Sequence, residues 1–124
     1  MVDLVDEKNV ERYEETYKSG TNHLYPNENI VRLIKWFFKG EGRVLDYGFG
    51  PGENLMHLLR LGYLCEGIEV SKHAIELVEN KLGKYPEFKE KVNLYLLNND
   101  QLRLPFDDNS LDYILSNQVI YFLA

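Results

Sequence analysis

The stretch Val44 to Gly52, which reads VLDYGFGPG, places three glycines spaced by one residue directly after a short apolar strand. Gly48, Gly50 and Gly52 permit backbone angles and a close approach to a ligand that a side chain would forbid. The chain can therefore turn sharply from the strand into a helix, expected over Glu53–Leu61, with a nucleotide bound against the turn. A sharp turn without a ligand also favours glycine, so the spacing alone does not establish a binding site.

Composition limits the class of protein. The 124 residues suit one domain, 44% hydrophobic content supplies a core, and the net charge of -6 with no cluster of Lys and Arg disfavours stable nucleic-acid binding. Cys65 is the single cysteine, so no internal disulfide can form. The first residues lack the pattern of a secretory signal, and every apolar run is far shorter than the roughly 20 residues that cross a bilayer. We therefore expect a cytoplasmic protein with no membrane association.

From Arg43 onward, short apolar strands alternate with helical segments. Strands are expected at Val44–Asp46, Leu64–Val70, Val92–Leu97 and Leu111–Ser116, and a second helix over Ser71–Leu82 with Ser71 as its N-cap. This order is typical of an α/β protein with a Rossmann-like parallel sheet, right-handed crossovers and helices on both faces. We expect one domain over residues 1–124, in which residues 41–124 form the Rossmann-like half.

Residues 1–40 are expected to form a helical N-terminal extension. Two helices are predicted, over Val5–Tyr17 and Ile30–Phe38, and Asn27 offers an N-cap for the second. The spacing of the second helix places four apolar residues near one face: Ile30, Ile34, Phe37 and Phe38. Trp36 lies to the side of that face.

Polar residues follow the strands where a parallel α/β sheet binds its ligands, at the carboxyl ends. Asp46 comes two residues before the first glycine, where a carboxylate repels a pyrophosphate but can hold an ammonium or sulfonium charge. Glu69 closes the second strand, where a carboxylate can accept both hydroxyls of a ribose. Asn117 follows the fourth strand. The alternative for Glu69 is an exposed acid at the end of a strand that binds no ligand.

Two further observations concern the identity of the ligand. The nicotinamide fingerprint requires a third glycine three positions after the second, and Glu53 stands there, which argues against a dinucleotide. Asp100 and Gln101 follow the third strand, where a side-chain acceptor and a backbone N–H could read the edge of an adenine ring. A loop Asp that forms an Asx turn is the alternative for Asp100. No pair of His or Cys residues has metal-ligand spacing, so no metal site is expected.

Three blocks of the chain resemble, in order, the class I S-adenosylmethionine-dependent methyltransferases. They are VLDYGFGPGENL, GIEVSKHAIELVEN and NDQLRLPFDDNSLDYILSNQVIYFL. The resemblance implies S-adenosylmethionine as cofactor and S-adenosylhomocysteine as product, and it implies a role for each matching position. These roles are the methionine end for Asp46 with Gly48, Gly50 and Gly52, the ribose for Glu69, the adenine face for Val70, the adenine edge for Asp100 with Gln101, and the sulfonium for Asn117.

The segment from Tyr13 to Arg32 resembles the N-terminal lid of small-molecule methyltransferases, and this implies that Tyr25 contacts the cofactor. Other positions depart from the family. Asn99 stands where the family usually has Gly, and Tyr121-Phe122 stand where small-molecule methyltransferases often have Glu-His. These departures leave the acceptor and any catalytic residue unidentified.

The resemblance predicts methyl transfer to a small-molecule acceptor. The family's sheet continues beyond a fourth strand, whereas this sequence ends at Ala124, just after it. We therefore expect either a fragment of a longer enzyme or self-association through the fourth strand or through Gln118–Leu123, because an unpaired edge exposes backbone groups. Two alternatives remain: a non-catalytic cofactor-binding fragment or subunit that needs a partner or a longer chain, and a nicotinamide-dependent oxidoreductase.

Overall fold

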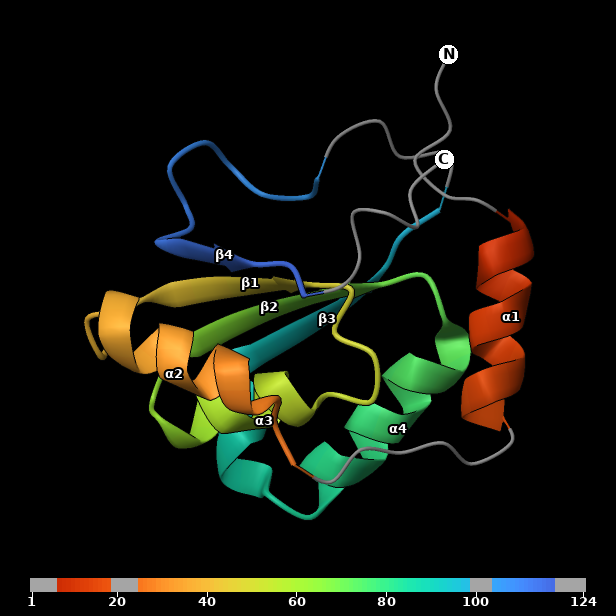
Figure 1. Ribbon diagram of the computed structural model, residues 1–124, viewed down its shortest axis with the longest axis horizontal. Coiled ribbons are helices and arrows are strands. Elements are labelled where there is room, and N and C mark those ends of the chain that lie inside the picture. Colours follow the sequence, from red (N-terminus) through yellow and green to blue (C-terminus); the bar gives the residue numbers. More distant parts are fainter. Residues whose placement is uncertain (1–6, 19–24, 99–103, 118–124) are drawn as a thin grey trace.

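Four parallel strands form one sheet in the computed structural model, which describes residues 7–18, 25–98 and 104–117 (Figure 1). The strands are β1 (Arg43–Tyr47), β2 (Leu64–Glu69), β3 (Val92–Leu96) and β4 (Tyr113–Leu115), in the order β3-β2-β1-β4. Strands β2 and β3 follow on one side of β1, whereas β4 lies on its other side, so the topological switch point lies between β1 and β4. Open α/β sheets bind their ligands at such a switch point. The predicted parallel Rossmann-like sheet is confirmed, with a shorter fourth strand than Leu111–Ser116.

Helices accompany the sheet in the predicted alternation. They are α1 (Glu7–Lys18), α2 (Glu28–Phe37), α3 (Glu53–Arg60), α4 (Lys72–Gly83) and a 3-10 helix, η1 (Pro86–Lys91), which the sequence analysis did not predict. Figure 1 shows α2, α3 and α4 on one face of the sheet, and α1 beside α4 at the end where β1 and β2 terminate. None of the described helices is long and apolar enough to cross a membrane.

Alternating strand side chains divide between two apolar clusters, because successive residues of a strand point to opposite faces. On the face of α3 and α4 the buried residues include Val44, Cys65, Val92, Leu55, Leu58 and Val78. On the other face Leu45, Ile68 and Leu97 are buried beneath Val10, Phe106 and Leu111. We expected helices on both faces. Within the described ranges, Val10 of α1 and the segment that precedes β4 cover the second face.

The cap and the buried face of α2 agree with the sequence except at one residue. The Asn27 side chain accepts hydrogen bonds from the backbone N–H groups of Asn29 and Ile30, and both isoleucines of the helix are buried. Phe37, however, is 69% exposed, so it does not share the burial of the two isoleucines with which it was grouped on one helical face. The helix ends at Phe37, and Phe38 continues in an extended conformation and stacks on Tyr113 at 4.0 Å. The helical spacing of apolar residues does not show whether the last turn of a helix still contacts the core.

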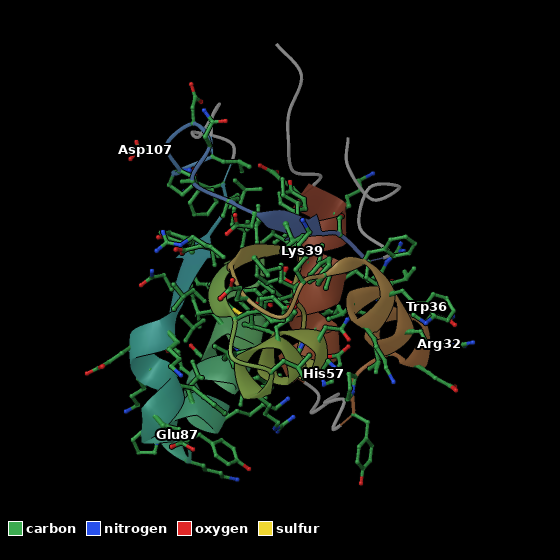
Figure 2. All side chains as sticks on the ribbon, turned by 90° about the vertical axis from the view of Figure 1, so that its left-hand side faces the viewer. Arg32, Trp36, Lys39, His57, Glu87 and Asp107 are labelled. Carbon is green, nitrogen blue, oxygen red and sulfur yellow. The ribbon has the colours of Figure 1, made fainter. Side chains whose placement is uncertain are left out.

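The outer side of α2 faces solvent. Figure 2 shows Arg32 and Trp36 projecting from this helix away from the rest of the chain, and Trp36 is 66% exposed. Strand β4 pairs with β1 and forms one edge of the sheet, with Ile114 63% exposed. Self-association through this strand stays a prediction.

Two tyrosine hydroxyl groups fasten the segment between α2 and β1. Tyr63, which is 1% exposed, accepts a hydrogen bond from the Gly40 N–H at 2.7 Å, and Tyr113 accepts one from the exposed Lys39 N–H at 2.9 Å. Removing an acceptor costs most where water cannot replace it. Tyr63→Phe should therefore lower the free energy of unfolding by about 1–2 kcal/mol and Tyr113→Phe by about half as much, measured by urea denaturation. Equal losses would contradict this account.

Candidate functional site

The glycine turn between β1 and α3 lies against α4 (Figure 1). Gly48, Gly50 and Gly52 have φ angles of 74°, 58° and 86°, in the region that favours glycine. A Cβ atom on Gly52 would lie 2.5 Å from Cγ2 of Val78, and the Lys81 ammonium donates a hydrogen bond to the Pro51 carbonyl. Glycine is thus required at position 52 both by conformation and by contact.

Glu69 points at the glycine turn from the end of β2. Its Oε2 accepts a hydrogen bond from the Gly50 N–H at 2.8 Å, and its Oε1 accepts from the N–H groups of Val70 and Ser71 at 2.8 and 3.3 Å. The residue is 7% exposed. Burial raises the pKa of Glu69, the three N–H donors oppose this shift, and the charge of Glu14 adds to it. A single buried carboxylate therefore connects the turn to the start of α4.

Asp46 lies at the carboxyl end of β1 and is 2% exposed. Its Oδ2 is buried and has no hydrogen-bond partner among the described residues. Burial, followed by the charges of Glu53 and Glu69, raises the pKa of Asp46 to about 8. An orphaned buried acceptor costs free energy, and a cationic donor placed beside it would recover that cost.

Within the described residues, the others predicted to bind the cofactor make no hydrogen bond to the glycine turn or to Glu69, apart from the backbone of Val70. Val70 is half-buried and packs against the apolar cluster of the second sheet face, and Asn117 is half-buried beyond β4. Tyr25 is 81% exposed. Asp100 and Gln101 lie outside the described residues. The predicted contact of Tyr25 and the roles of the other four residues therefore stay predictions.

Sequence reasoning missed several residues that shape the site. Glu53 was used only as evidence against a dinucleotide, yet its charge is the second cause of the high pKa of Asp46. Val78 and Lys81 touch the turn from α4, and their spacing of three residues puts them on one helix face. That spacing showed a common face, but no signal in the sequence showed that this face meets the glycine turn.

The carboxylates and the turn fit a ligand that carries sugar hydroxyls and a positive charge. A carboxylate has about four acceptor sites, and three backbone donors use three of those on Glu69, so one remains for a sugar hydroxyl. Asp46 supplies the orphaned acceptor for a cation. Over residues 7–18, 25–98 and 104–117, no group of three or more His, Cys, Asp and Glu side chains is arranged to hold a metal ion.

A parallel α/β sheet with a glycine-rich turn after β1 and an acid at the end of β2 is the arrangement of a Rossmann-like domain. Within that class, residues 45–124 match the family described as the methyltransferase domain, so the chain belongs to this family. This confirms the predicted resemblance to the class I S-adenosylmethionine-dependent methyltransferases. No functionally curated protein matches the sequence at a significant level.

Solved structures share the fold. A protein of Methanococcus maripaludis assigned as an S-adenosyl-L-methionine-dependent methyltransferase has 22% sequence identity and a TM-score of 0.67. The superposed region covers 94% of this chain and 52% of that protein. Geranyl diphosphate C-methyltransferase of Streptomyces coelicolor has 16% identity and a TM-score of 0.70, with 94% and 54% covered. The [4+2]-cyclase SpnF has 16% identity and a TM-score of 0.67, with 92% and 50% covered. The chain spans about half the length of these structures.

The contact between the turn and α4 can be tested at two glycines with similar backbone angles. Gly62 has a φ of 97° and open space where its Cβ would lie, whereas Gly52 would meet Val78. Gly62→Ala should therefore cost about 1 kcal/mol from backbone strain alone, and Gly52→Ala about 3 kcal/mol, in urea denaturation. Adding Val78→Ala should recover part of the excess, relative to Val78→Ala alone. Equal costs at both glycines would contradict the contact.

Proposed function

We propose that the chain binds S-adenosylmethionine and belongs to an enzyme that transfers its methyl group to a small-molecule acceptor. The observation that carries the proposal is the orphaned Oδ2 of Asp46 beside a Glu69 that reaches the glycine turn. Membership of the methyltransferase domain family supports it independently of the geometry.

In this proposal each residue recognises one part of the cofactor. Asp46 holds the positively charged methionine end, and the backbone of residues 48–52 approaches it closely because the glycines carry no side chains. The acceptor site that the backbone leaves on Glu69 accepts a hydrogen bond from a ribose hydroxyl, and Val70 lies on the adenine face. The roles of Asp100 and Gln101 at the adenine edge, of Asn117 beside the sulfonium and of Tyr25 in the lid rest on the family resemblance.

The cofactor, when bound, supplies a methyl group activated by the sulfonium. The protein mainly has to bind and orient the two reactants and exclude water. The deep burial of Asp46 and Glu69 provides a water-poor surface for the cationic end of the cofactor. Because acceptors differ in whether they need a general base, we assign no catalytic residue.

A second candidate is a non-catalytic cofactor-binding fragment or subunit. The observation that favours it is the name of the [4+2]-cyclase, which indicates that this fold is not restricted to methyl transfer. A nicotinamide dinucleotide is disfavoured, because Glu53 stands where the nicotinamide fingerprint requires its third glycine and because Asp46, once ionised, would repel a pyrophosphate.

Ligand binding tests the proposal directly. S-adenosylhomocysteine at 100 times its dissociation constant should add about 2.7 kcal/mol to the free energy of unfolding of the full chain, whereas NAD should add nothing. Glu69→Gln should weaken binding at least tenfold, measured by calorimetry below the unfolding temperature of the variant. Glu87→Gln is the control, since Glu87 lies exposed on η1 (Figure 2). Stabilisation by NAD and not by S-adenosylhomocysteine would overturn the proposal.

The affinity should also depend on pH through Asp46. Because the pKa of Asp46 is raised to about 8, this carboxyl group carries a proton below that pH. A cationic ligand must displace the proton, so the affinity for S-adenosylhomocysteine should rise by more than about tenfold from pH 6 to pH 8 and level off only above the pKa of Asp46. Asp46→Asn should bind more weakly at pH 8 and show a flatter pH profile. A wild-type affinity independent of pH would contradict this role.

A further inference from the structure

Helix α1 is tied to the first residues of α4 through one side chain. Oε1 of Glu14 accepts a hydrogen bond from the Lys72 N–H, and Oε2 of Glu14 lies 3.2 Å from Nε2 of His73. The other ring nitrogen of His73 lies 3.5 Å from Oε2 of Glu76. The Glu14 side chain is 24% exposed, so the contact is partly shielded from water. Glu14 therefore makes two contacts with adjacent residues of a segment distant in sequence.

The segment that Glu14 holds continues directly from the proposed ribose acid. At the start of α4 the backbone N–H groups are shared among three acceptors: Glu69 takes those of residues 70 and 71, Glu14 takes that of residue 72, and Ser71 Oγ takes that of residue 74. Two of the three acceptors belong to this segment itself. Glu14 comes from α1 and fixes where that helix lies relative to Glu69.

An apolar contact supports the same placement. Val10 lies one helical turn before Glu14, so the two share a face of α1. Val10 packs against the cluster of Leu45, Ile68 and Leu97, and the same cluster contacts Val70, the residue proposed for the adenine face. Figure 1 shows α1 standing beside α4 at the carboxyl ends of the strands. One face of α1 thus meets the site through a polar and an apolar contact.

We propose that Glu14 is a positioning residue for the cofactor, which anchors α1 to the turn that carries Glu69. The inference rests on the proposed function. Anchoring places α1 along the carboxyl edge of the sheet, so that binding of the cofactor and docking of α1 favour each other. Because coupling of this kind is reciprocal, the ligand stabilises α1 to the extent that α1 strengthens binding of the ligand.

Two substitutions at this position separate the two contacts. Glu14→Ala removes both, whereas Glu14→Gln keeps an oxygen that can accept from the Lys72 N–H but loses the charge that faces His73. Glu15→Ala is the matched control, because Glu15 is exposed on the same helix and changes the net charge equally. We expect the affinity for S-adenosylhomocysteine to fall at least fivefold in Glu14→Ala, less in Glu14→Gln and less than twofold in Glu15→Ala.

Hydrogen exchange supplies a readout that a purely structural role would not move. S-adenosylhomocysteine should slow amide exchange in residues 7–18 of the wild type and of Glu15→Ala, but not of Glu14→Ala. Circular dichroism confirms that each variant is folded before the comparison. Equal affinity in the wild type and Glu14→Ala, with equal slowing of exchange in α1, overturns the inference and leaves the proposed function intact. A wild-type chain that does not bind S-adenosylhomocysteine overturns the proposed function itself.

Discussion

The bridge that Glu69 makes between the glycine turn and the start of α4 is the constraint on which the site depends. Its two oxygens accept from Gly50 on one side and from Val70 and Ser71 on the other, so the turn, β2 and α4 meet at one buried carboxylate. Without it the N–H of Gly50, which is buried, would lose its partner. The residue that is proposed to recognise the ribose therefore also determines the shape of the loop that would approach the rest of the cofactor.

A second consequence is electrostatic. Asp46, Glu53 and Glu69 lie close enough to one another for two of the charges to raise the pKa of the third. Lys81 contacts the turn at Pro51, and burial, with Glu53 opposing it, lowers the pKa of its ammonium group. Gathering carboxylates in a buried place opposes folding, and proteins tolerate such costs where binding recovers them. A cationic ligand is the kind of group that would do so here.

Local signals in the sequence were enough for much of this arrangement. Glycines with positive φ, the caps Asn27 and Ser71, and the alternation of strands and helices are properties of short segments, and the structure has them where they were predicted. The exposed Phe37 and the contacts of Glu14 were not predictable in this way. They depend on where a helix ends relative to the core and on which surface it meets. The spacing of apolar residues along the sequence gives no information on either.

Buried acids at the two ends of the sheet have different charged neighbours. Near the amino end, Glu66 is 4% exposed, and its Oε1 lies 3.6 Å from the guanidinium of Arg43 and accepts a hydrogen bond from Asn93. Oε2 of Glu66 has no hydrogen-bond partner among the described residues, but the charge of the group faces a cation. At the carboxyl end Asp46 is as deeply buried, yet its two largest charge interactions are with other carboxylates. Since the same fold pairs a buried acid with arginine at one end, the arrangement around Asp46 supports the proposal that a positive charge arrives there with the ligand.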